Sequence, residues 1–209
     1  MLSDLASASF IAGSALSVLG VATVREVRHG REMALAAVPL LFGIQQLVEG
    51  LLWLSFDFNV PWLQVATTHL FSFFSHVLWP VFVPLAVGTL ETVRWRRNAL
   101  HGFLAAGLGV GLYLLYVLVR FPVTAEAAPN IVYLSPHFFG VPVMLAYLAA
   151  TCVGPMFSSY PLIRWFGALA LLFFLISYGF FTIAMISVWC FFAALLSALI
   201  YLHFRRVRT

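Results

Sequence analysis

Three polar side chains stand close together in the middle of a long apolar run. Gln45, Gln46 and Glu49 lie within the segment Phe42–Trp53, whose other residues are apolar or glycine. At the centre of a transmembrane helix an acidic side chain costs about 2.5 kcal/mol or more, so it normally faces a partner, a cavity or a ligand. Glu49 is therefore the first candidate for a functional residue, and its partner must come from elsewhere in the chain.

The next apolar run carries a polar stripe at a depth that suits Glu49. His69, Ser72 and His76 follow one another at i, i+3 and i+7, a spacing that places them on one face of a helix. Only a short connection separates the two runs, so residues equally far from it along the chain lie at equal depth. Glu49 is then level with His69, and Gln46 with Ser72. We expect Glu49 and His69 to meet.

This polar set favours a binding or transport site in the outer half of the protein, for a proton, a metal ion or a small ligand. The carboxyl group would supply charge, and a histidine would supply a group that titrates near neutral pH. The predicted ligand-binding residues are Gln45, Gln46, Glu49, His69, Ser72 and His76. A metal centre would need Glu49, His69 and His137 from three helices, because the close-spaced histidine pairs of common zinc sites are missing.

Two other functions are compatible with the same residues. In the first, the protein is a membrane-embedded, metal-dependent or metal-free enzyme that acts on a lipid or an isoprenoid, with Glu49 as general base and His69 as general acid or metal ligand. In the second, it is a structural scaffold in which a buried Glu49–His69 pair only fixes the register of two helices. His76 is also compatible with a hydrogen-bonded histidine of the core.

The composition of the chain is that of an integral membrane protein. Hydrophobic residues make up 63% of the sequence and charged residues only 9%, against about a quarter in soluble proteins. Apolar runs of about 20 residues, each long enough to cross about 30 Å of hydrocarbon as a helix, alternate with short polar segments. We expect an all-α fold, a seven-transmembrane-helix bundle in a single domain, residues 1–209, with spans at about 7–24, 33–56, 62–89, 100–119, 137–157, 165–183 and 185–204.

The arginines predict the orientation of this bundle. All 11 basic residues are arginine, and all but Arg120 lie in the connections and the tail on one side of the predicted bundle. Because basic residues accumulate on the cytoplasmic side, we expect the N-terminus outside and the C-terminus in the cytoplasm. This arrangement accounts for the net charge of +4 without a nucleic-acid partner.

A proline in the third span predicts an irregular backbone beside the polar stripe. Pro80 cannot donate a hydrogen bond to the carbonyl group of His76, so the helix should kink there. Irregular backbone at membrane depth is tolerated where protein or trapped water satisfies it, which points this face inward. Further candidates in the outer halves of the spans are Tyr133, His137, Ser177, Tyr178, Ser187 and Cys190.

Small residues predict close contacts between helices. Gly13, Ser17 and Gly20 in the first span, and Gly107 and Gly111 in the fourth, form patterns in which small residues recur every three or four positions. Such patterns favour helix packing within the chain. The glycines of the fourth span are equally suited to a contact between two copies of the protein, so a homo-oligomer is compatible with the sequence.

Three segments resemble a family of small, uncharacterised bacterial multi-pass membrane proteins. They are Leu41–Gly50, which reads LFGIQQLVEG, the pair Trp79-Pro80, and Ser187–Ala194, which reads SVWCFFAA. The start of the chain, Ala6–Phe10, is similar as well. The resemblance implies a location in the bacterial inner membrane, with the lipid bilayer as partner, and brings no known activity.

Seven spans with an outer N-terminus are also the architecture of rhodopsins and G-protein-coupled receptors. The sequence contains no lysine, and a retinal Schiff base needs a lysine amine. Covalently bound retinal is therefore excluded, and a metal ion is the cofactor for which we keep a candidate site.

Overall fold

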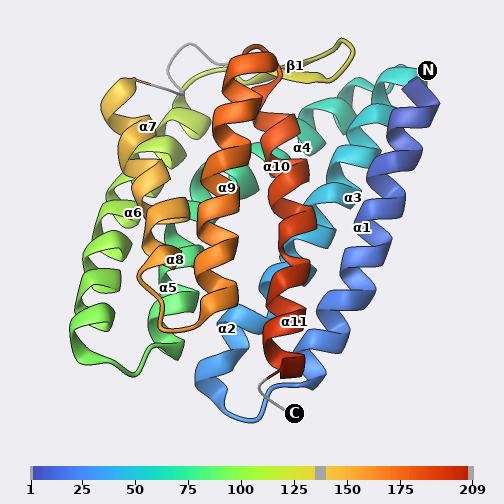
Figure 1. The fold of residues 1–209 in the computed structure, drawn as a ribbon. Helices are drawn as coiled ribbons and strands as arrows, with labels where there is room; N and C mark the ends of the chain where they lie inside the picture. The colour runs from blue at the N-terminus through green and yellow to red at the C-terminus, as the bar shows by residue number, and fades with distance from the viewer. Residues whose placement is uncertain (1, 135–139, 207–209) are drawn as a thin grey trace.

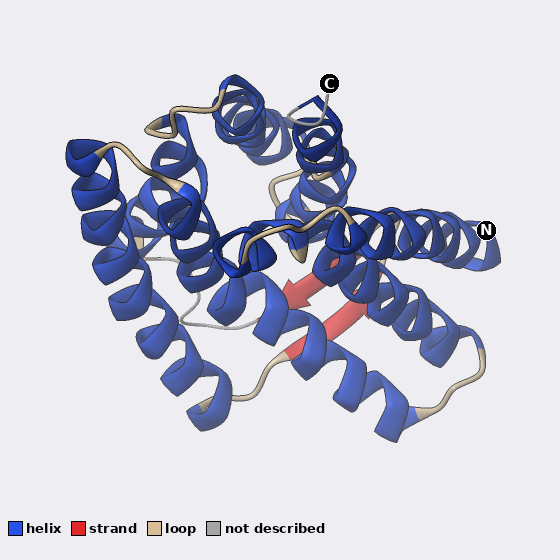
Figure 2. Ribbon diagram, turned by 90° about the horizontal axis from the view of Figure 1, so that it is seen from below, coloured by secondary structure: helices blue, strands red, loops and turns tan. Residues whose placement is uncertain are grey.

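The computed structural model describes residues 2–134 and 140–206 as a bundle of helices with a β-hairpin across one end (Figure 1). The N-terminal end of the chain lies at the hairpin end of the bundle, and the C-terminal end lies at the opposite end (Figure 1). Viewed along the helices, the two strands cross the far end of the bundle (Figure 2). The predicted helical bundle is thus present, and the hairpin is an addition that the apolar pattern does not predict.

The elements vary in length because several spans are interrupted. Those labelled η2 and η3 are π-helical turns and η1 is a 3₁₀ turn. In chain order the elements are α1 (Leu2–Arg25), η1 (Gly30–Glu32), α2 (Met33–Ala36), α3 (Val38–Asp57), α4 (Pro61–Ser72), η2 (Phe73–Leu78), α5 (Trp79–Leu90), α6 (Arg94–Arg120), β1 (Thr124–Ala127), β2 (Ile131–Leu134), α7 (Val141–Leu148), η3 (Ala149–Val153), α8 (Gly154–Met156), α9 (Pro161–Phe180), α10 (Met185–Leu196) and α11 (Ala198–Arg206).

Six helical segments of the described chain are long and apolar enough to cross a membrane. They are Asp4–Arg25, Gly30–Asp57, Pro61–Leu90, Arg94–Arg120, Pro161–Phe180 and Met185–Arg206. The chain is therefore a multi-pass membrane protein. These segments correspond to six of the seven predicted spans.

The predicted span 137–157 is the one that differs. Residues 137–139 lie outside the described residues, and the helix that follows, Val141–Met156, has 8, 5 and 3 residues in its three parts. At 1.5 Å per residue it is about 24 Å long. This is shorter than the roughly 30 Å of a bilayer core.

Close packing of α1 against α3 places the segment that carries Glu49. A Cβ atom at Gly20 would lie 2.4 Å from the backbone nitrogen of Leu40, and one at Gly43 would lie 2.6 Å from Ser17 Oγ. Both helices therefore need glycine where they cross. This confirms that the small residues of the first span serve packing within the chain. The close contact holds one side of α3 against α1.

The glycines of the fourth span also pack inside the chain. A Cβ atom at Gly107 on α6 would lie 1.8 Å from the carbonyl oxygen of Pro80, and one at Gly111 would lie 2.9 Å from Val81 Cγ2. Since both positions are covered by α5 and the end of η2, this stripe is not free for a contact between two copies of the protein.

A π turn breaks the third span beside His76, at the position that Pro80 predicts. The backbone is π-helical over Phe73–Leu78, and α5 begins at Trp79 with Pro80 in its first turn. In the first turn of a helix the backbone N–H group has no intrahelical acceptor. A proline, which lacks this group, is therefore tolerated there, and the helix can begin again at this point.

The β-hairpin closes the end of the bundle over α3, α4 and α10. Its two strands pair in antiparallel register, with Ala125 opposite Tyr133. The Tyr133 ring stacks on Phe71 with ring centroids 4.6 Å apart, and Gln64 Nε2 donates to the Ala125 carbonyl at 3.4 Å. Residues of both strands thus join the buried cluster that contains Leu52 and Cys190.

Candidate functional site

Glu49 lies on α3 in the interior of the protein, with 2% of its surface exposed. Ser187 donates a hydrogen bond from Oγ to Glu49 Oε1 at 2.6 Å. Ser187 is itself buried and lies in the first turn of α10, which begins at Met185. The positive end of a helix dipole favours a nearby carboxylate, so both the hydroxyl group and the helix end suit an acidic side chain here.

Gln45 and Gln46, the two predicted residues one turn before Glu49, have different surroundings. Both are fully buried. Gln45 Oε1 accepts a hydrogen bond from Trp79 Nε1 at 2.7 Å, and Phe42 stacks on the same indole with ring centroids 3.8 Å apart. Gln46 makes no hydrogen bond of ordinary geometry among the described residues, although its side chain lies next to the Glu49 carboxyl group. One glutamine therefore holds α3 to α5, and the other borders Glu49.

The polar interior continues along α4 and η2. Ser72 and His76 are fully or almost fully buried, and Ser75 Oγ lies 2.7 Å from His76 Nδ1. His76 Nδ1 also lies 3.1 Å from the Ser72 carbonyl oxygen. Tyr147 on α7 donates to the Ser75 carbonyl. These side chains are buried, and the hydrogen bonds of Ser75, His76 and Tyr147 go to other groups of the protein. This is what we expect of a structural polar core.

His69 does not take the place that the sequence predicts. Its Nδ1 lies 2.8 Å from the Val65 carbonyl oxygen on the same helix, and the side chain is partly exposed. Ser187, not His69, is hydrogen-bonded to Glu49. The residue in line with Ser72 and His76 is Thr68, which lies four positions before Ser72 and is buried. A spacing of four keeps to one face as well as a spacing of three, so the sequence alone did not choose between the two.

A cavity of about 200 Å³ lies beside Glu49. It reaches from the first part of α1 across α3 to the start of α10, with the turn of the hairpin at its edge. The lining is apolar and aromatic apart from four polar side chains. The lining residues are Leu5, Ala8, Ser9, Glu49, Trp53, Asn130, Phe181, Ser187, Val188, Phe191 and Phe192.

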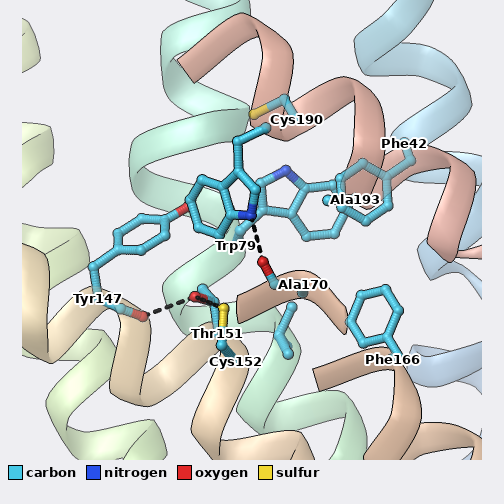
Figure 3. Close-up of a pocket in the computed structure, with 11 residues that line it drawn as sticks. Phe42, Trp79, Tyr147, Thr151, Cys152, Phe166, Ala170, Cys190 and Ala193 are labelled. Atoms are coloured by element: carbon cyan, nitrogen blue, oxygen red, sulfur yellow. Dashed lines mark hydrogen bonds between the residues drawn. The ribbon is translucent and has the colours of Figure 1, made fainter. Parts of the chain in front are cut away.

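A second cavity, of about 30 Å³, lies deeper in the bundle, and Figure 3 shows side chains from several helices converging on it. Its walls include Trp79, Phe42, Tyr147 and Cys190. This cavity is about the size of one water molecule, and its lining is almost wholly apolar. It therefore has few groups that could hydrogen-bond to a polar ligand. Cys190 lies one turn after Ser187 on α10, so the two cavities border the same helix. Cys152 and Cys190 are both free and buried.

Several buried polar atoms near these residues have no hydrogen-bond partner in the part of the chain that is described. They are Gln45 Nε2, both amide atoms of Gln46, and the hydroxyl oxygens of Thr68, Ser72, Tyr133 and Ser177. Burial and then the neighbouring Glu49 carboxylate raise the pKa of Tyr133 well above its ordinary value, so its phenol stays protonated as a donor. Unsatisfied buried groups cost about 1–3 kcal/mol each, which makes bound water or a polar ligand in this region favourable.

The metal centre stays a prediction. Glu49 and His69 do not share a hydrogen bond, and His137 lies outside the described residues. Within residues 2–134 and 140–206, no group of three histidine, cysteine, aspartate or glutamate side chains could hold a metal ion.

The structure joins the three segments on which the family resemblance was based. Gln45 and Glu49 belong to the first, Trp79 to the second and Ser187 to the third, and the two hydrogen bonds Trp79–Gln45 and Ser187–Glu49 link them. Sequence reasoning included Ser187 among the outer-half candidates but not as the partner of Glu49. Its signal was a hydroxyl group in the first turn of an otherwise apolar run.

These features define the class of protein: a helical multi-pass membrane protein with a buried acidic site beside a cavity. The chain matches the model of a family of unknown function (DUF6629) over residues 2–209, and it belongs to this family. Neither a search of curated proteins nor a search of solved structures gave a match.

Proposed function

We propose that this chain is a bacterial inner-membrane protein that binds or transports a small molecule, and that the ligand lies in the cavity beside Glu49. The observation that carries the proposal is a carboxyl group in the membrane interior that is held by Ser187 and lines a cavity of about 200 Å³. A water molecule takes up about 30 Å³ of liquid volume, so the space exceeds what a proton or a bare metal ion needs.

The orientation is part of the proposal. With seven spans and the N-terminus outside, the hairpin end of the bundle and the cavity near it face the periplasm. Two arginine clusters support this choice, because Arg94, Arg96 and Arg97 begin α6 and Arg205 and Arg206 end α11, at the end of the bundle away from the hairpin. The short helix Val141–Met156 would cross as the remaining span.

Retention of a bound molecule tests the binding function. Protein purified in a mild detergent is examined by native mass spectrometry, and we expect a small-molecule adduct on the wild type. Ala8 is exposed and lines the cavity. A tryptophan at this position is large enough to fill the cavity, so in Ala8→Trp the adduct should be lost while the melting temperature is maintained.

The control is Ala105→Trp, at an exposed alanine on α6 that is not part of the cavity lining. This variant should keep the adduct. A wild-type protein without any adduct, or an adduct that survives in Ala8→Trp, would overturn the proposal and favour the scaffold alternative.

A further inference from the structure

We infer that the ligand of this cavity is an amphiphilic organic ammonium ion, which enters from the bilayer between α1 and α10. The inference rests on the proposed function, because it names the class of molecule that the same cavity takes. It follows from three features of the cavity: the charge of its lining, the aromatic side chains around it, and the place where it opens.

The only charge that the described lining can carry is negative. Glu49 is the one ionisable side chain among the described residues that line the cavity, and no arginine lies there to pair with it. Ser9, Asn130 and Ser187 are neutral. A buried carboxylate without a cationic partner is costly, so a cationic ligand gains the charge pairing that the protein itself does not provide.

The aromatic side chains suit an ammonium group better than a metal ion. Trp53, Phe181, Phe191 and Phe192 supply four rings to the walls, while the oxygen and nitrogen ligands that a metal ion needs are few. The face of an aromatic ring attracts a cation, and cages of such rings with an acidic side chain recognise alkylammonium groups. The remaining walls, from Leu5, Ala8 and Val188, are apolar and can contact the alkyl part.

The position of the opening points to the bilayer. Ala8 on α1 and Phe181 before α10 are both exposed, and they line the cavity from its two sides. Glu49 lies eight residues before the end of α3, about 12 Å below it by helix rise. An amphiphile at the membrane interface would thus place its charged group near Glu49 while its chain remains among apolar side chains and lipid.

Three probes with one carbon framework test the inference. We would titrate 4-phenylbutylammonium, 4-phenylbutanol and 4-phenylbutyrate into the protein in maltoside micelles at pH 8 and measure heat by calorimetry. The ammonium compound should bind the wild type at least tenfold more tightly than the alcohol and the carboxylate. Glu49→Gln keeps the shape of the side chain but removes its charge, and it should reduce ammonium affinity to that of the alcohol.

Two variants keep the test meaningful if Glu49→Gln folds poorly. Ala8→Trp fills the cavity at an exposed position and should abolish ammonium binding, whereas Ala105→Trp on α6 should bind as the wild type does. Equal affinity for the ammonium compound and the alcohol, or unchanged ammonium binding in a folded Glu49→Gln protein, would overturn the ammonium class. An ammonium affinity that is equal in Ala8→Trp and the wild type would overturn the cavity as its site.

The two proposals fail in different ways. If the wild type carries an adduct that Ala8→Trp loses, but prefers the alcohol or the carboxylate probe, the cavity binds a ligand of another class. If the adduct is absent and none of the three probes binds, the proposed function itself is wrong.

Discussion

At the scale of single residues, two neighbouring glutamines have different roles in stability. Gln45 accepts the indole hydrogen bond of Trp79, whereas both amide atoms of Gln46 lack a partner in the described chain. We predict that Gln45→Leu lowers the free energy of unfolding by about 1–3 kcal/mol, because Trp79 Nε1 is left buried without an acceptor. Gln46→Leu should cost much less or be stabilising, since it removes buried polar atoms that are already unsatisfied.

The measurement is the midpoint of thermal unfolding of both variants in the same detergent. The adjacent position serves as the control, because both side chains are glutamine, fully buried and on α3. A loss of stability in Gln46→Leu as large as that in Gln45→Leu would mean that Glu49, a bound molecule or water satisfies Gln46.

At the scale of helix contacts, Gly107 should be the most sensitive position on α6. An added Cβ atom would lie 1.8 Å from the Pro80 carbonyl oxygen, so Gly107→Ala must push α6 away from α5. We predict a loss of about 3 kcal/mol or failure to accumulate as folded protein. Folded yield and melting temperature report the effect.

Gly109 provides the matched control on the same helix. No atom lies within 4 Å of an added Cβ atom there, so Gly109→Ala should leave stability unchanged or raise it by up to about 1 kcal/mol through helix propensity. Equal behaviour of the two variants would argue against the close contact of α6 with α5.

A second contact between elements depends on pH. Glu91, in the connection from α5 to α6, accepts hydrogen bonds from Ser159 N at 2.7 Å, from Ser159 Oγ at 2.8 Å and from Val93 N at 2.9 Å. Burial alone would raise the pKa of Glu91, but these hydrogen bonds outweigh it and hold the pKa below its ordinary value. The carboxylate thus ties the connection to the segment before α9.

Because the folded-state pKa is lowered, this contribution is present above the ordinary glutamate pKa of about 4.3 and is lost as the pH falls through the lower folded-state pKa. Glu91→Gln should therefore melt at a lower temperature than the wild type at pH 7, and the difference should shrink below about pH 4. A difference that stays constant down to pH 3 would contradict this assignment.

At the scale of the whole molecule, the arginines predict how the bundle lies in the membrane. A green fluorescent protein fused after Thr209 should fluoresce, because that end is expected in the cytoplasm, while an alkaline phosphatase fused there should be inactive. A phosphatase fused after Asn130, in the hairpin, should be active. The reverse pattern would place the cavity on the cytoplasmic side and refute the proposed orientation.

The sequence by itself determined the class of this protein and singled out Glu49 as the first candidate for a functional residue. Apolar runs of spanning length can only satisfy their backbone groups as helices in a membrane, so composition was sufficient for the helical bundle. An acidic residue amid such a run is so costly that Glu49 could be singled out without a structure. The same logic placed an irregular turn beside His76, since Pro80 cannot donate its backbone hydrogen bond.

Only the tertiary structure decided what Glu49 meets. The sequence paired it with His69 by equal depth on neighbouring helices, but depth does not fix the rotation of a helix, and Thr68 faces inward instead. Ser187 comes from a helix 138 positions later in the chain, where neither periodicity nor spacing relates it to α3. The cavity arises from side chains of four separate segments, so its volume and opening depend on long-range packing that local sequence patterns do not encode.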